Sequence, residues 1–151
     1  MEHSKMRNIL IYFALKYKGQ FKDVYEAIKT KEKVANDVVV VEKLNDVKYH
    51  TVTVVDENYP FIFKVDEIHN PPFVLFYQGN LSILNDHKTT KELVFEDGTR
   101  CFTTIEPDLV DGKVIFDYVI CCENQDNIDK VLEHMRSKGL RFKDYQGSEC
   151  N

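Results

Sequence analysis

Cysteine and histidine are the residues of this chain best suited to nucleophilic or metal chemistry. Cys121 and Cys122 are adjacent in an apolar run, and His134 follows in a segment with helical periodicity. Neighbouring side chains of a strand point to opposite faces, so only one of these thiols can face His134. That leaves too few ligands for a zinc site, and a buried thiol is a poor nucleophile. We therefore predict no metal site and no catalytic residue.

The four cysteines, which include Cys101 and Cys150, show no paired C-x-x-C spacing. This favours reduced thiols over a disulfide framework. The sequence also has no apolar run near the roughly 20 residues that span a bilayer, and no cleavable leader pattern. We expect a cytoplasmic protein that does not enter a membrane and needs no cofactor.

Asp117 lies between Phe116 and Tyr118 in an otherwise apolar segment. A buried carboxylate is costly unless it is paired, so Asp117 is expected to contact Arg100 or a lysine. This structural role is the main interpretation. A pocket lined by Arg100, Asp117 and aromatic rings would instead suit a small ligand or a nucleotide.

Basic and aromatic residues alternate near the C-terminus, where rings beside cations could stack the bases of single-stranded DNA. The candidate DNA-binding residues are Lys138, Arg141, Phe142, Lys143 and Tyr145. A solvated helix end followed by an edge strand is the alternative interpretation. The 151-residue chain has 20 Lys and Arg against 25 Asp and Glu, a formal charge of −5. DNA binding would therefore need a local basic patch.

Hydrophobic spacing predicts the elements that must position these residues. Helices are expected at 6–17 and 21–28, and a third is favoured within 32–47, where four consecutive β-branched residues leave a strand as the alternative. A strand at 51–55, a short helix starting at Pro60 and a strand at 73–77 follow. The C-terminal half predicts hairpin strands at 93–95, 101–105 and 114–122, a helix at 128–135 and an edge strand at 140–145.

These elements predict an α/β or α+β fold, with N-terminal helices packed beside a mixed sheet and a C-terminal β-meander and helix. The expected organisation is a helical region at 1–47, an α/β domain at 48–145 and a tail at 146–151. With 43% apolar residues, the chain can form a real core.

Residues 49–84 carry a distinctive order of strand, short helix and strand. The stretch contains Tyr59-Pro60, Pro71-Pro72, an apolar run and Gly79-Asn80. It resembles the DNA-processing protein A (DprA, or Smf) family, and the preceding helices are similar to the N-terminal region of some members. The resemblance implies a helical lead-in followed by a Rossmann-like domain, with these motif residues mainly shaping the fold. Such proteins protect single-stranded DNA and help load recombinase through protein contacts and dimerisation, without catalysing a reaction.

The chain departs from the family pattern after Leu84. A phosphate-facing Gly-Ser-Arg loop is expected there, but the sequence reads Asn-Asp-His-Lys-Thr-Thr, and its six glycines are isolated. The family's DNA-binding loop and arginine therefore cannot be transferred. We expect a non-enzymatic, divergent or shortened DprA-like protein, with single-stranded DNA, a recombinase, a DprA-like protein or a second copy as partner. A small-ligand or nucleotide-sensing module is the alternative. A hydrolase is disfavoured, because the sequence contains no recognisable nucleophile.

Overall fold

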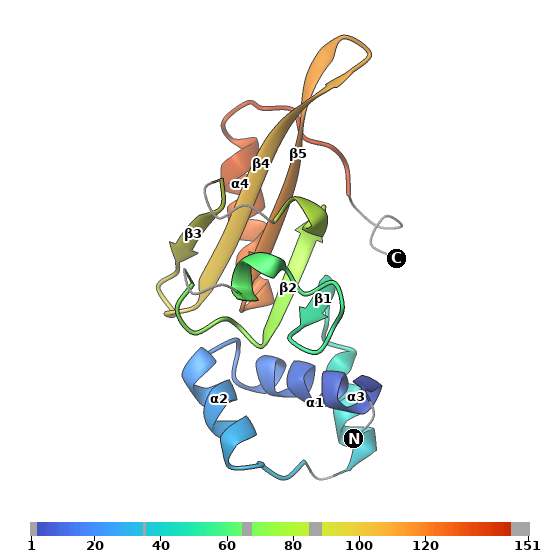
Figure 1. Ribbon diagram of the computed structural model, residues 1–151, viewed down its shortest axis with the longest axis vertical. Helices are drawn as coiled ribbons and strands as arrows, with labels where there is room; N and C mark the ends of the chain where they lie inside the picture. The colour runs from blue at the N-terminus through green and yellow to red at the C-terminus, as the bar shows by residue number, and fades with distance from the viewer. Residues whose placement is uncertain (1–2, 35, 65–67, 85–88, 146–151) are drawn as a thin grey trace.

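The computed structural model describes residues 3–34, 36–64, 68–84 and 89–145 (Figure 1). Three helices form one end of the molecule, a sheet lies in the middle, and a two-stranded arm projects at the other end. The helices are α1 (His3–Lys16), α2 (Phe21–Lys29), α3 (Asp37–Leu44) and α4 (Ile128–Arg136). The strands are β1 (His50–Thr53), β2 (Val74–Gly79), β3 (Lys91–Val94), β4 (Arg100–Val110) and β5 (Lys113–Cys122).

Helix α1 connects the helical region to the sheet. Its residues Leu10, Ile11 and Ala14 are buried in the same core as sheet residues, while Phe13 faces α2. The predicted helices at 6–17 and 21–28 are confirmed. The helical region thus shares a core with the sheet that carries the candidate sites.

Helix α3 resolves the ambiguity at 32–47 in favour of the predicted helix, although it is shorter than the segment. The Asn36 side chain caps it by accepting a hydrogen bond of 3.0 Å from the Val39 backbone N–H. Only Val40 of its four valines is buried, and Val38 and Val41 are exposed. Helix α3 therefore presents an apolar outer surface.

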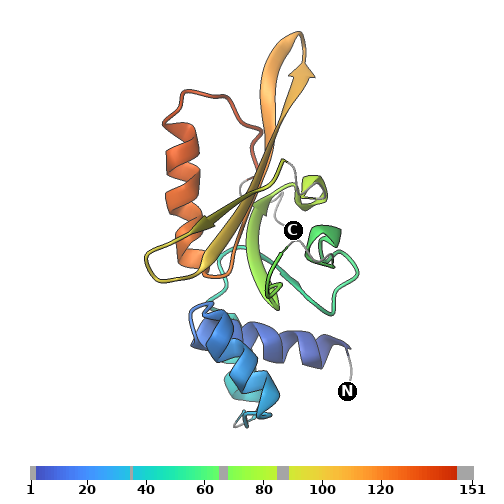
Figure 2. The same ribbon diagram turned by 60° about the vertical axis from the view of Figure 1, so that its left-hand side comes forward.

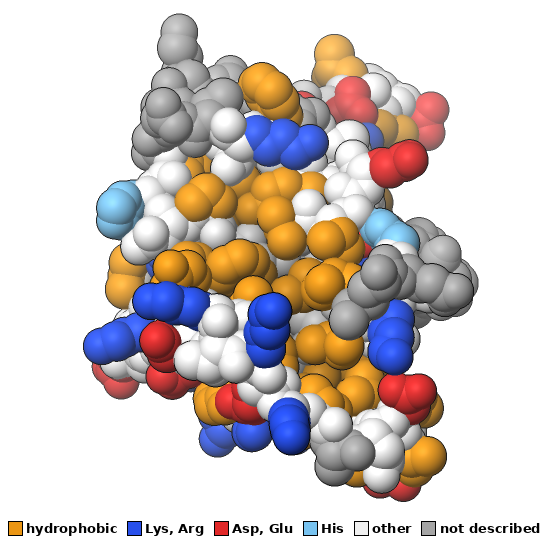
Figure 3. All heavy atoms as spheres, turned by 60° about the horizontal axis from the view of Figure 1, so that its bottom comes forward, with side chains coloured by type: hydrophobic (Ala, Val, Ile, Leu, Met, Phe, Trp, Pro, Cys, Tyr) orange, Lys and Arg blue, Asp and Glu red, His pale blue; other side chains and the backbone are white. Residues whose placement is uncertain are grey.

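Hydrophobic side chains on the outer face of the helical region are only partly covered by other residues. Figure 3 shows hydrophobic side chains gathered across the middle of this face, with lysine and arginine side chains around them. The partly buried residues that pack on the core between α1 and α2 include Ile9, Tyr12, Tyr17, Ile28 and Val34. This end of the molecule therefore keeps some apolar surface in contact with solvent.

The sheet has the strand order β1-β2-β5-β4-β3, and all of its pairs are antiparallel. The expected fold class, N-terminal helices packed beside a sheet with a C-terminal β-meander and helix, is confirmed. The expectation of a mixed sheet is wrong, because every pair among the described strands is antiparallel. The Rossmann-like pairing at 49–84 is wrong, because β1 and β2 are antiparallel neighbours. A parallel crossover usually needs a full helix, whereas the described residues of this connection contain only the 3-10 helix η1 (Phe61–Lys64).

Both faces of the sheet centre are covered, as the continuously apolar run of β2 predicts. Helices α1 and α4 pack on the face that contains Phe76, Tyr118 and Ile120. The other face, including Leu75, is covered by η1 and its flanking loop. Figure 2 shows α4 on one side of the sheet and the short helices on the other.

Strands β4 and β5 extend beyond the rest of the sheet as an arm, defined here as residues 105–117 (Figures 1 and 2). The predicted Asp111-Gly112 turn joins them, with φ values of 51° and 76°. Leu109 and Val114 lie opposite each other and are 72% and 52% exposed. The arm therefore carries apolar side chains on an open surface.

The edge strand predicted at 140–145 is wrong in extent. Phe142 forms one isolated parallel bridge with Phe116. Phe116 donates its N–H to the Arg141 carbonyl at 2.8 Å, and its carbonyl accepts from the Lys143 N–H at 2.9 Å. The described residues of the segment form no further backbone hydrogen bond with β5, and the Tyr145 side chain contacts Asp117 instead.

Candidate anion-binding site

The predicted basic and aromatic residues lie together beside the end of α4. Lys138 follows the helix, and the bridge at Phe142 holds the chain against β5. Between this segment and α4 lies a concavity of about 330 Å³, which we call the C-terminal pocket. Its lining residues are Tyr118, Leu132, Arg136, Leu140, Arg141, Phe142, Lys143 and Asp144.

Three cations line the C-terminal pocket against one carboxylate. Arg136 and Arg141 are exposed, and neither side chain forms an ion pair within the described parts of the chain. Lys143 is engaged, because its ammonium group lies 2.8 Å from Asp108 and 3.8 Å from Asp117. The two arginines are therefore the groups available to an anion. One guanidinium group can bind two oxygens of a phosphate through two parallel hydrogen bonds.

Arg136 is not among the residues predicted from the sequence, where the cluster begins at Lys138. The signal was present, because Arg136 closes the amphipathic helix that carries Leu132 and stands two residues before Lys138. Lys138 itself is exposed and does not line the pocket. The structure thus brings together most of the predicted cluster and adds one arginine.

The predicted stacking rings are already part of internal packing. Phe142 lies 5.9 Å from Phe116 and 5.6 Å from Tyr118 between ring centres. Tyr145 packs edge-on against Tyr118 at 5.5 Å. Both rings are half-buried, so a base could stack on an exposed part of a ring but could not be held between two of them.

Asp117 lies at the centre of a hydrogen-bonded cluster, as its position in an apolar strand predicts. Its carboxylate accepts hydrogen bonds from the side chains of Asn80, at 3.0 Å, and Tyr145, and from the Tyr118 N–H. Burial by itself would raise the pKa of Asp117. These hydrogen bonds and the charge of Lys143 outweigh burial and hold the pKa below its usual value.

The expected lysine partner of Asp117 is confirmed, and Arg100 is not a partner. Arg100 instead binds Glu123 through two side-chain hydrogen bonds of 2.9 and 2.8 Å. It also donates to the carbonyl oxygens of His69 and Asn70. The strand register places Arg100 at the start of β4 and pairs Asp117 with Glu106, six positions further along β4, so the two residues lie apart.

The residues that resemble the DprA motif make contacts that shape the fold. The Tyr59 hydroxyl donates a hydrogen bond of 2.7 Å to the Pro72 carbonyl, which joins the Tyr59-Pro60 turn to the Pro71-Pro72 pair. At Gly79, φ is 101° and an added Cβ would lie 2.2 Å from the Tyr118 carbonyl oxygen. Asn80 caps the short helix η2 (Leu81–Ile83) and also contacts Asp117.

The prediction that the cysteines are reduced is wrong at two positions, because Cys101 and Cys122 form a disulfide. The signal was in the sequence. The two-residue Asp111-Gly112 turn pairs Val110 with Lys113, and the same register continues to Cys101 opposite Cys122.

Cys121 points to the opposite sheet face and is a buried free thiol, and burial raises its pKa. Cys150 lies outside the described residues. No group of His, Cys, Asp and Glu suited to a metal occurs within the described segments.

Comparison of the chain with protein-family models, curated proteins and solved structures found no match. In the part of the chain that the structure describes, no helix combines the length and apolar character needed to cross a bilayer.

Proposed function

We propose that this chain is a non-enzymatic, divergent DprA-like protein that binds single-stranded DNA in DNA processing or recombination, or modulates a full-length relative. The observation that carries the proposal is the C-terminal pocket, where Arg136 and Arg141 stand unpaired beside an apolar floor. The arginines would contact two phosphates, and the exposed edge of Phe142 would meet a base.

Charge sets the expected strength of this binding. The protein has a formal charge of −5, so long-range attraction to DNA is weak and local contacts must supply the affinity. Two phosphate contacts with a single strand give a slope of log K against log salt of about −1.4. Binding should therefore weaken about sevenfold between about 50 and about 200 mM salt.

The arm supports a protein partner, for which we propose a recombinase, a DprA-like protein or a second copy. Ile105, Leu109 and Val114 lie on one face of the arm and are all exposed. Pro107 lies opposite Phe116, whose N–H and C=O point away from β4 toward the 141–143 segment. Pro107 therefore offers no N–H at the outer edge of β4, and this disfavours the pairing of a partner's strand with that edge. A protein partner would instead contact the apolar face of the arm.

The cytoplasmic location remains part of this proposal, and the disulfide stands against it. Disulfides such as Cys101–Cys122 are rare in proteins of a reducing cytosol. The alternative function, a small-ligand or nucleotide sensor at Arg100 and Asp117, loses its proposed pocket because these residues lie apart.

Fluorescence anisotropy of a labelled single-stranded oligonucleotide tests the proposal. We expect micromolar binding at low salt that weakens with the slope given above. Absence of binding at low and at physiological salt would reject a DNA-binding role. The proposed protein partner at the arm would then be the remaining part of the proposal.

A further inference from the structure

A second cavity, of about 470 Å³, opens between the helical region and the sheet. It lies among the end of α1, the turn that follows α3, and the loop between β5 and α4. We call it the interregion cavity. Its volume falls in the range of about 300–1,000 Å³ that is typical of small-molecule sites.

Hydrogen bonds fix the walls of the interregion cavity relative to each other. The buried Gln125 side chain accepts from the Lys48 N–H at 2.9 Å and donates to the Asp46 carbonyl at 2.8 Å. The turn after α3 is thus held to the β5–α4 loop, 77 to 79 positions away in sequence. The backbone of such a wall is preformed, so ligand binding needs to order only the exposed lysine side chains.

The end of α1 is held against the same loop by backbone packing. Lys18 and Gly19 have φ values of 50° and 76°, so the chain turns sharply after the helix. A Cβ on Gly19 would lie 2.3 Å from the Glu123 carbonyl oxygen, which shows how closely the two segments approach. A lysine in the left-handed region is uncommon, and here this conformation places Lys18 at the cavity.

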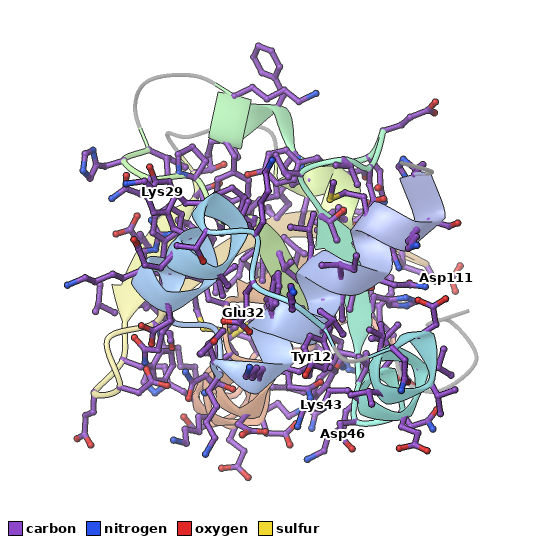
Figure 4. The ribbon with its side chains drawn as sticks, turned by 90° about the horizontal axis from the view of Figure 1, so that it is seen from below. Tyr12, Lys29, Glu32, Lys43, Asp46 and Asp111 are labelled. Atoms are coloured by element: carbon purple, nitrogen blue, oxygen red, sulfur yellow. A yellow bond between two sulfur atoms is a disulfide. The ribbon has the colours of Figure 1, made fainter. Side chains whose placement is uncertain are left out.

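Three lysines line the interregion cavity against two aspartates. Lys43 pairs with Asp46 at 3.3 Å, and Lys48 reaches Asp126 at 4.0 Å. All four of these side chains are well exposed, so each pair contributes only about 0–1 kcal/mol and can yield to an anion. Lys18 forms no ion pair with any described residue. Figure 4 shows Lys43 and Asp46 together at the end of α3.

The apolar lining residues are Ala14, Leu15 and Phe76, of which Ala14 and Phe76 are buried, so the half-exposed Leu15 supplies the accessible apolar side chain. Lysine binds phosphate as a point charge, and an apolar wall accepts a planar or hydrocarbon group. We propose that the interregion cavity binds a small phosphate monoester that carries a group with an apolar face, the class to which nucleoside monophosphates belong. This site is separate from the C-terminal pocket and does not depend on DNA binding.

Isothermal titration calorimetry with a nucleoside monophosphate, at constant ionic strength, tests this site. We expect binding that is tighter than that of inorganic phosphate and of the uncharged nucleoside. The double variant Lys18→Gln/Lys43→Gln should weaken it at least tenfold, because two charged contacts are lost. The control Lys64→Gln/Lys113→Gln removes the same charge from exposed positions elsewhere and should bind like the wild type.

Absence of heat with the nucleoside monophosphate would overturn the proposal. Equal binding by wild type and Lys18→Gln/Lys43→Gln would overturn it as well. The same double variant should keep the wild-type affinity for the single-stranded oligonucleotide, so a failure of this site is distinguishable from a failure of the DNA-binding proposal.

Discussion

Cys101 and Cys122 form a disulfide between directly opposed residues of the two longest strands, in the buried part of the sheet below the arm. The disulfide lies in the core beneath α4, next to residues such as Ile120 and Ile128. It therefore holds together the two strands that carry Asp117, the arm and one wall of the C-terminal pocket.

Reduction of this disulfide should lower the free energy of unfolding by about 3 kcal/mol, the chain-entropy value for a closed loop of about 20 residues. Urea unfolding with and without a reductant measures the difference. A thiol assay on the denatured protein should find two more free thiols after reduction than before. An equal thiol count would contradict the disulfide.

Substitution of Gly19 by alanine should destabilise the protein by more than about 2 kcal/mol, through backbone strain and a steric clash. The clash is with the Glu123 carbonyl, 2.3 Å from the added Cβ. Gly112→Ala is a matched control, because Gly112 has the same φ of 76° but nothing within 4 Å of its added Cβ. Equal losses of thermal stability in the two variants would contradict the close packing of α1 on the β5–α4 loop.

Asp117→Asn should cost about 1–3 kcal/mol at neutral pH, because the amide replaces a carboxylate that accepts several hydrogen bonds. The pKa of Asp117 in the folded protein is lower than the ordinary value of 3.8. The ionised carboxylate therefore stabilises the fold fully above about pH 3.8, and this stabilisation is lost as the pH falls through the folded-state pKa.

The stability gap between wild type and Asp117→Asn should therefore narrow below about pH 4. Thermal unfolding from neutral pH to pH 3 measures it, with Asp111→Asn at the arm tip as a control that should match the wild type. A gap that stays constant to pH 3 would show that the carboxylate charge is not what stabilises the cluster.

The sequence was sufficient for most elements because their signals are local. Periodic apolar residues predicted α1, α2 and α4, and the Asp-Gly pair predicted the long hairpin. Strand direction is a long-range property. The motif at Tyr59 and Pro72 predicted the order of elements but not the antiparallel pairing of β1 with β2.

Part of the candidate site was also predictable from the sequence, because some of its residues are close together along the chain. Clustering along the chain identified Arg141 and Lys143, which do meet in one pocket. It could not show that Lys143 is occupied by Asp108 and Asp117, because these contacts join segments 26 to 35 residues apart. The Arg100–Asp117 pocket failed because both residues found other partners.

The arm's apolar face should control association without controlling stability. Leu109→Glu/Val114→Lys should change the free energy of unfolding by less than about 0.5 kcal/mol per site, because both side chains are largely exposed. Light scattering over a concentration series should show less self-association than in the wild type. If the wild type is monomeric throughout, a second copy is not the partner of the arm.

The proposed DNA-binding function requires that Arg136 and Arg141 bind the phosphates of single-stranded DNA. Anisotropy with a labelled oligonucleotide should be compared for wild type, Arg136→Gln/Arg141→Gln and the control Lys64→Gln/Lys113→Gln, which loses equal charge. We predict at least tenfold weaker binding and a flatter salt dependence for the arginine variant alone. Equal binding by all three proteins would show that Arg136 and Arg141 do not bind the DNA.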